Sequence, residues 1–300
     1  MSAHAITRRS WFEADARTRI HGLVDAGSFS ELCGPHERLT SPHLAVLDLP
    51  VAFDDGVVVG EATLDGERIL VGAQQGEFNG GSVGEIHGAK LRGLLDRARD
   101  TRPAAVLLAI DSGGVRLHEA NAGLIAISEL MRALLGARAA GVPVYGLIGG
   151  SCGAFGGMGI VARLCDGLIM SEEGRLGLSG PEVIETVKGV DEFDSKDRAL
   201  VWRITGGKIR RTLGEATLLV DDDLGAFRGG AKALLARGAP LRGLAALDAD
   251  QAALAARAQR HADARDGLDI WRALGLPDAE RLAMLDADAF NRIIDRAETA

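Results

Sequence analysis

The sequence predicts an α/β protein in which buried strands alternate with helices. Three times, a short apolar run ends in glycines and gives way to a helical pattern: at Gly80-Gly81, at Gly113-Gly114, and from Gly149-Gly150 to Gly156-Gly157. The units recur about every 35 residues, which indicates a supersecondary repeat rather than a repeated sequence. Hydrophobic residues make up 47% of the 300 residues, enough for a substantial core. No Ser/Gly/Pro-rich linker divides the chain, so we expect a single domain over residues 1–300.

Apolar periodicity and its interruptions predict the elements in order. Ser10 and Glu13 form a capping box, which predicts a helix to about Leu23. Two β-rich runs then flank Asp65-Gly66, the signature of a hairpin. Next we expect a helix that ends at Pro103, a strand over 104–110, a helix over 117–139, a strand over 144–148, and helices over 157–164, from Pro181 and over 194–205. Residues 1–25 and 231–300 are predicted to be helical extensions.

Composition excludes several classes of function. A net charge of −8 and an aromatic content of 4% argue against a nucleic-acid partner. The longest apolar runs are too short to span a membrane, and the N-terminus has no signal-peptide pattern. The three cysteines, Cys33, Cys152 and Cys165, lack metal-ligand spacing and suit a reducing cytoplasm, so we expect neither a metal nor a disulfide.

The glycine pairs suggest chemistry performed by the backbone. Two adjacent N–H groups at Gly113-Gly114 could form half of an oxyanion hole, because glycine lets a carbonyl oxygen approach closely. The alternative is an ordinary strand–helix turn. Gly156-Gly157, at the glycine-rich start of the later helix, also has two interpretations: close approach of a ligand to the backbone, or tight packing. Asp111 and Arg116 bracket the first pair and are placed to pair with each other and fix the loop.

A competing hypothesis is a serine hydrolase. Gly149–Gly153 reads G-G-S-C-G, which matches a nucleophile elbow with Ser151 as nucleophile. Only His261 follows it, however, inside a helical pattern, and Cys152 as nucleophile would lack a base for the same reason.

Other polar residues have mainly structural interpretations. We expect His87, His118 and Glu119, which lie near glycine turns, to be structural or at the surface. The acidic runs Glu172-Glu173 and Asp221–Asp223 are expected at exposed loops or helix starts. The basic run Lys208–Arg211 fits a phosphate site or a solvated face equally well.

Four stretches carry a family resemblance: FNGGSVG (Phe78–Gly84), DSGGVRLHE (Asp111–Glu119), GGSCGAFGGMGIVARLCD (Gly149–Asp166) and LGLSGPEVIE (Leu176–Glu185). In this order and spacing they resemble the carboxyltransferase branch of the crotonase (ClpP/enoyl-CoA hydratase) superfamily. The runs GGSCGAFGG and GPEVIETVKGVDEFDSKD are most similar to β subunits of the biotin-independent malonate decarboxylase family.

The resemblance implies a crotonase-like spiral of ββα units. It also implies decarboxylation of a malonyl thioester on an acyl carrier protein, through a CoA-derived phosphopantetheine arm and without biotin or metal. Oxyanion donors are then expected at Gly113 and Gly114, and at Gly156 or Gly157. Contacts to the cofactor arm are expected at Gly80, Gly81, Ser112, Arg116, Ser151 and Gly153. A homologous second subunit is expected to complete the active site.

The resemblance leaves alternatives open. The chain lacks the four-cysteine zinc ribbon of bacterial acetyl-CoA carboxylase β subunits, which argues against that assignment. A related acyl-CoA carboxyltransferase, an enoyl-CoA hydratase/isomerase and a non-catalytic scaffold for the carrier arm remain. The hydratase would need paired carboxylates near the second glycine-rich helix start.

Overall fold

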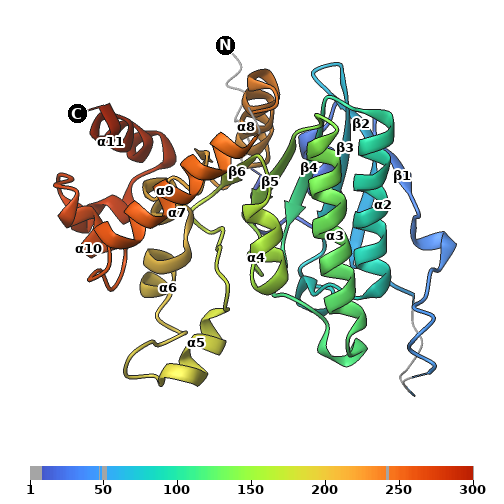
Figure 1. Cartoon of the computed structure of the whole chain (residues 1–300), viewed down its shortest axis with the longest axis horizontal. Coiled ribbons are helices and arrows are strands. Elements are labelled where there is room, and N and C mark those ends of the chain that lie inside the picture. The colour runs from blue at the N-terminus through green and yellow to red at the C-terminus, as the bar shows by residue number, and fades with distance from the viewer. Residues whose placement is uncertain (1–8, 47, 49–52, 241–242, 300) are drawn as a thin grey trace, which may run out of the picture.

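A seven-stranded mixed sheet forms the centre of the molecule (Figure 1). The computed structural model describes residues 9–46, 48, 53–240 and 243–299. The strands follow in chain order across the sheet: β1 (Ser30–Leu32), β2 (Val57–Leu64), β3 (Glu67–Gln74), β4 (Ala105–Ile110), β5 (Val144–Ile148), β6 (Gly167–Met170) and β7 (Leu218–Leu219). The first three strands are antiparallel and β3 to β7 are parallel. The predicted hairpin at Asp65-Gly66 is confirmed, and both residues have the positive φ of a tight hairpin turn.

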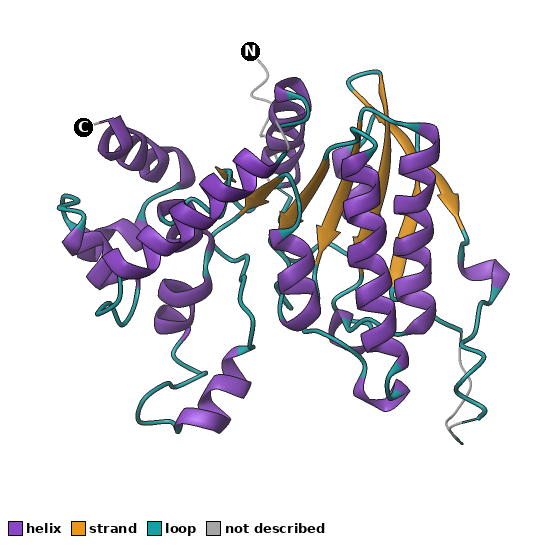
Figure 2. Ribbon diagram, viewed as in Figure 1, coloured by secondary structure: helices purple, strands orange, loops and turns teal. Residues whose placement is uncertain are grey.

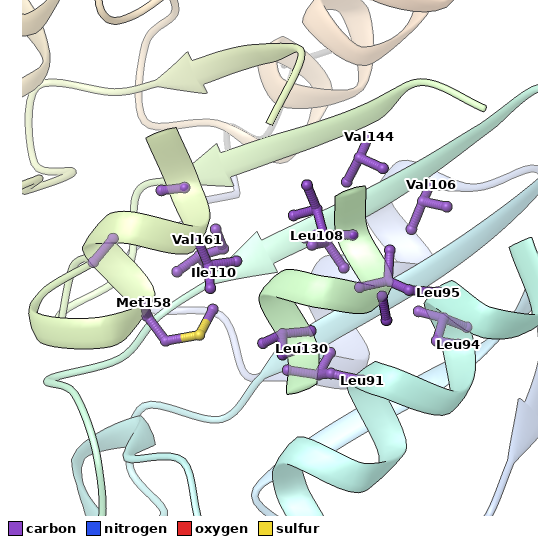
Figure 3. Packing of buried hydrophobic residues seen from close by; sticks show 14 of the residues in the cluster. Leu91, Leu94, Leu95, Val106, Leu108, Ile110, Leu130, Val144, Met158 and Val161 are labelled. Carbon is purple, nitrogen blue, oxygen red and sulfur yellow. The ribbon is translucent and has the colours of Figure 1, made fainter. Parts of the chain in front are cut away.

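Helices cover both faces of the sheet. One face carries α2 (Glu85–Thr101), α3 (Ala122–Ala139) and α4 (Gly156–Arg163), and the other carries α1 (Ala16–Leu23) and α8 (Leu224–Arg237). Strand β4 serves both layers, because successive side chains point to opposite faces. Val106, Leu108 and Ile110 pack with α2, α3 and α4 (Figure 3), and the intervening β4 residues pack with α1 and α8. This double coverage explains the uninterrupted apolar strands of the sequence.

The remaining helices extend to one side of the sheet (Figure 2). They are α5 (Pro181–Lys188), α6 (Arg198–Thr205), α7 (Gly207–Thr212), α9 (Leu244–Arg260), α10 (Gly267–Ala273) and α11 (Ala287–Thr299), together with the 3-10 turn η4 (Ala279–Met284). Three further 3-10 turns lie in the loops after β1, β3 and β4: η1 (Pro35–Glu37), η2 (Asn79–Gly81) and η3 (Leu117–Glu119). Trp271 and Phe290 lie in a separate cluster between the C-terminal helices and β7, so this extension has a core of its own. No helix in the described ranges is long and apolar enough to cross a bilayer.

Three predicted helix starts are wrong by several residues. Ser10 accepts the N–H of Glu13 as a capping box would, but the helix begins at Ala16, where the side chain of Asp15 caps it. Ala120 has a φ of 49°, which separates η3 from α3, and the helix expected from 194 begins at Arg198. Residues 1–8, 241–242 and 300 of the predicted extensions lie outside the described residues.

Candidate active site

The loops at the carboxyl ends of the parallel strands are joined to one another. Single-residue bridges connect them: Val83 with Val115, Ser112 with Ala154, and Ala154 with Leu176. These bridges bring together the three turns that the sequence singles out, at Gly80-Gly81, Gly113-Gly114 and Gly156-Gly157. Ligands of open parallel sheets bind at this edge.

Close approach explains the glycines at two of the turns. A Cβ on Gly81 would overlap the carbonyl oxygen of Asp111, and a Cβ on Gly156 would lie 3.3 Å from the Cα of Gly114. Gly81, Gly114 and Gly156 also have φ values of 63°, 134° and 56°, which disfavour a side chain. The second and third turns therefore touch through their backbones.

The four candidate oxyanion donors differ in their hydrogen bonds. The N–H of Gly113 donates to the carbonyl of Gly80 at 2.9 Å, and that of Gly156 donates to the carbonyl of Leu178 at 2.8 Å. The N–H of Gly114 has only the Ser112 hydroxyl oxygen, at 3.2 Å. The N–H of Gly157 has no acceptor within the described part of the chain. The N–H groups of Gly157 and Gly114 are thus the least engaged of the four, although Gly114 is buried and Gly113 is exposed. Gly157 adds the positive end of the α4 dipole.

The residues expected to contact the cofactor arm also fall into two groups. Gly81, Ser112 and Gly153 are buried in the turns, and the Ser112 N–H donates to the Gly153 carbonyl at 2.7 Å. Gly80 and Ser151 are exposed. The Gly80 N–H lacks an acceptor among the described residues.

Arg116 is a buried support for the loop. It forms two hydrogen bonds with Asp54, at 2.7 and 3.1 Å, and binds Glu119 at 3.1 Å and the Ser82 carbonyl at 2.9 Å. All three guanidinium nitrogens therefore have protein acceptors. The predicted pairing of Arg116 with Asp111 is wrong, because Asp111 pairs with Arg19 at 2.8 Å.

The sequence analysis missed Arg19. The residue lies on the face of α1 that also buries Ala16 and Ile20. A lone arginine among apolar positions of a helical pattern is the signal that could have identified it.

The described residues do not assemble a serine or cysteine nucleophile. The Ser151 hydroxyl contacts only the Cys152 sulfur, at 3.9 Å, and the Ser151 carbonyl accepts a bond from Arg175. His261 lines a different cavity, beside Cys165 and α9. Burial, followed by the charge of Asp111, raises the pKa of the Cys152 thiol, which disfavours its nucleophilic form.

The histidines near the turns have the expected structural roles. His87 is fully buried beside Gln74, and burial lowers its pKa to about 3, so the ring is neutral. His118 is exposed and lines a cavity of about 300 Å³ with Asn79 and Arg116. Within the described ranges, no group of three or more His, Cys, Asp or Glu residues could hold a metal ion.

Predictions for the charged runs are partly wrong. Glu172 and Glu173 are half-buried, and burial raises the pKa of Glu172 to about 7. Lys208 and its neighbours form neither a phosphate site nor a solvated face: Lys208 is buried, with Nζ bound to the Ala283 carbonyl, and Arg210 binds Glu215. The Asp221–Asp223 prediction is confirmed at its last residue, since Asp223 caps α8.

This sheet, with its joined glycine turns, defines a crotonase-fold carboxyltransferase. The chain belongs to the carboxyl transferase domain family, which matches residues 13–236. It is 40% identical to the malonyl-S-ACP:biotin-protein carboxyltransferase MADC of Malonomonas rubra, over 94% of both chains. It is accordingly an enzyme of the carboxyltransferase and decarboxylase type.

Solved structures agree with this assignment. A Pseudomonas malonate decarboxylase hetero-tetramer in complex with malonate contains a chain that is 40% identical, with a TM-score of 0.76 over 86% of this chain and 92% of that one. The Pseudomonas MdcD–MdcE hetero-dimer gives 38% identity and a TM-score of 0.66, over 81% of this chain and 95% of that one. Transcarboxylase 12S with methylmalonyl-coenzyme A bound gives 28% identity and a TM-score of 0.62, over 74% of this chain and 40% of that one.

Proposed function

We propose that this chain is one subunit of a malonate decarboxylase that acts on a malonyl thioester of an acyl carrier protein. The bond between the CH2 carbon and the carboxylate breaks, CO2 leaves, and the electron pair forms an enolate with its charge on the thioester oxygen. A proton then adds to the CH2 carbon and gives the acetyl thioester. The similar chains in the Pseudomonas malonate decarboxylase structures support this substrate class.

The contact between the Gly114 and Gly156 turns carries the proposal. It brings the weakly engaged N–H of Gly114 next to the start of α4, where the N–H of Gly157 has no acceptor among the described residues. Two such donors aimed at the thioester oxygen would each stabilise the enolate-like transition state by about 2.7–4 kcal/mol. Gly113 could join them only by leaving the Gly80 carbonyl, so we assign it to the shape of the turn.

The phosphopantetheine arm would lie along the exposed edge of the same turns. The accessible N–H of Gly80 and the hydroxyl of Ser151 fit the amide and carbonyl groups of such an arm. When bound, the arm supplies the thioester whose oxygen the backbone donors face. We include neither biotin nor metal in the reaction.

Carboxyl transfer to a biotin protein is the second candidate, because the Malonomonas relative is named for it. Both reactions share the cleavage step and differ in what captures the carboxyl group. A hydratase has less support. A hydratase would need a pair of carboxylates near α4, but the side chain beside Gly157 there is Ile127. The nearby carboxylates of Asp111 and Glu119 are each bound to an arginine.

A homologous subunit would complete the site. Exposed apolar side chains on the elements around the glycine turns support this proposal: Leu117, Leu124, Ile125, Ile160, Leu178, Val183 and Val187. An apolar surface of this kind at the rim of a site is typical of a subunit interface. The free thiols of all three cysteines are compatible with a cytoplasmic assembly.

Replacement of Gly157 by proline or alanine tests the donor. Proline removes the N–H at a first-turn position that tolerates it, whereas alanine adds a similar Cβ against Ile127 but keeps the N–H. In the assembly co-purified with this chain, we expect malonate-dependent CO2 release by Gly157→Pro to be about 10²–10³-fold slower than by Gly157→Ala. Equal rates would contradict this role and favour a scaffold. Loss of wild-type release on adding avidin would favour transfer to biotin.

A further inference from the structure

Asp111 joins the ends of three neighbouring strands. It follows β4, and its Oδ1 accepts the backbone N–H of Cys152 in the loop after β5, at 2.7 Å. Its own N–H donates to Oε1 of Gln74, the last residue of β3, at 3.2 Å. Its Oδ2 accepts from Nη1 of Arg19 at 2.8 Å. One carboxylate thereby fixes the loops that lead to Gly114 and to Gly157.

Gly76 and Gly150 lie against Asp111 and leave space for its carboxylate. A Cβ on Gly150 would overlap Cγ and both oxygens of Asp111, and a Cβ on Gly76 would overlap Oδ2. The side chain is only 2% exposed. Gly150, which resembles part of a nucleophile elbow in the sequence, therefore accommodates Asp111.

Arg19 neutralises the buried carboxylate and is itself held in place. Its Nε donates to the Trp11 carbonyl at 2.9 Å, its Nη2 donates to the Phe12 carbonyl at 3.3 Å, and its guanidinium lies 5.6 Å from the centre of the Trp11 ring. Neutralisation matters because a lone buried negative charge close to a developing enolate would oppose it.

We propose that Asp111 and Arg19 are a positioning pair for the reaction, in which Asp111 sets the separation of the Gly114 and Gly157 donors and Arg19 cancels its charge. This inference rests on the proposed function. Both side chains are buried, so neither would touch the substrate. They act through the two loops, and a small displacement of a donor costs up to about 10²-fold in rate.

Asp166 provides a matched control. Its carboxylate is also buried, accepts a backbone N–H from Val144 at 2.9 Å, and pairs with an arginine, Arg138, at 2.9 Å. It lies at the opposite ends of the strands, however, where β5 begins. Asp166→Asn should therefore destabilise the fold as Asp111→Asn does, without moving the donors.

The test compares Asp111→Asn, Asp166→Asn, Arg19→Met and the double variant Arg19→Met/Asp111→Asn in the co-purified assembly. We expect kcat to fall at least about tenfold in Asp111→Asn relative to Asp166→Asn at an unchanged KM. We expect Arg19→Met to be slower than the double variant, because only the single variant leaves a lone carboxylate. Should Arg19→Met fail to fold, the comparison of kcat between Asp111→Asn and Asp166→Asn still tests the positioning role of Asp111.

Alkylation of Cys152, followed by mass spectrometry of its peptide, provides a readout that does not depend on activity. Asp111→Asn should accelerate it, because an amide oxygen holds the Cys152 N–H more weakly than a carboxylate and the variant removes a charge that raises the pKa of the thiol. An inactive wild-type assembly would refute the proposed function, and alkylation would still report whether Asp111 holds the loop. Equal kcat in Asp111→Asn and Asp166→Asn, or unchanged alkylation, would overturn the positioning role.

Discussion

Gly114 and Gly156 meet backbone to backbone, so that a Cβ on Gly156 would stand 3.3 Å from the Cα of Gly114. The two residues are far apart in the sequence but jointly determine where the donors of two loops lie. Their contact can be varied without removing any functional group.

Gly156→Ala should separate the two turns. We expect a loss of about 1–2 kcal/mol in stability from the positive φ of 56°, together with a fall in kcat. Gly141→Ala is the control: φ there is 88°, but a Cβ would meet nothing within 4 Å. Urea unfolding and CO2 release should show similar destabilisation and a rate loss only at Gly156. Equal rate losses would disprove the importance of the contact.

Gly113→Ala should retain nearly full activity, contrary to what the sequence alone suggests. Its N–H is already bound by Gly80, and a Cβ would meet only the Gly80 carbonyl, at 3.5 Å. Gly81→Ala, where a Cβ would overlap Asp111, should instead fail to accumulate as folded protein. Steady-state kinetics and thermal unfolding check both. Alanine keeps the N–H, so a rate loss of about 10²-fold in a stable Gly113→Ala would show that the thioester oxygen approaches Gly113 closely, and would return that residue to the oxyanion site.

Arg116→Met should affect stability more than substrate binding. It leaves Asp54 and Glu119 buried without their partner, at a cost of about 3–5 kcal/mol. Denaturant unfolding measures the loss, and the KM of any protein that folds should change little. A raised KM at unchanged stability would show that Arg116 binds the cofactor arm.

Glu172 should make stability depend on pH. Burial raises its pKa from 4.5 to about 7, so the folded protein holds a proton that the unfolded chain releases. The stability that this bound proton contributes is complete below about pH 4.5 and is lost as the pH rises through about 7. Glu172→Gln mimics the protonated form, so its unfolding free energy relative to wild type should increase between about pH 5 and about pH 8. A constant difference would show that the carboxyl titrates normally.

Val187→Asp should weaken assembly with the homologous subunit. This side chain is 80% exposed on α5, and a carboxylate there would be costly to bury. We expect at least about tenfold weaker association in analytical ultracentrifugation. Met284→Asp, at a side chain 84% exposed in the C-terminal extension, is the control and should assemble normally. Loss of assembly in both variants, or in neither, would argue against this interface.

Much of the fold was predictable because its signals are local. Apolar runs identify β4 and β5, and glycines mark the turns that follow them. Contacts between distant segments were not predictable. Arg19 and Asp111 are 92 positions apart, and local periodicity carries no information about such a pair. The prediction for the basic run at Lys208 was wrong for a similar reason, because the partner of Lys208 comes from a distant element that packs on it.

The N-terminal segment that carries Arg19 is held by residues made much later in synthesis. Ser10 and the N–H of Phe12 bind Asp222, 212 and 210 positions away, and the carbonyl of Arg9 accepts the N–H of Leu224. Contacts between residues so far apart in the sequence form late, because a long loop must close first. A ribosome-bound chain would thus complete Asp111's environment only after residue 224 has emerged. A truncated product ending earlier would carry an unfinished site, so incomplete chains would be inactive as well as unstable.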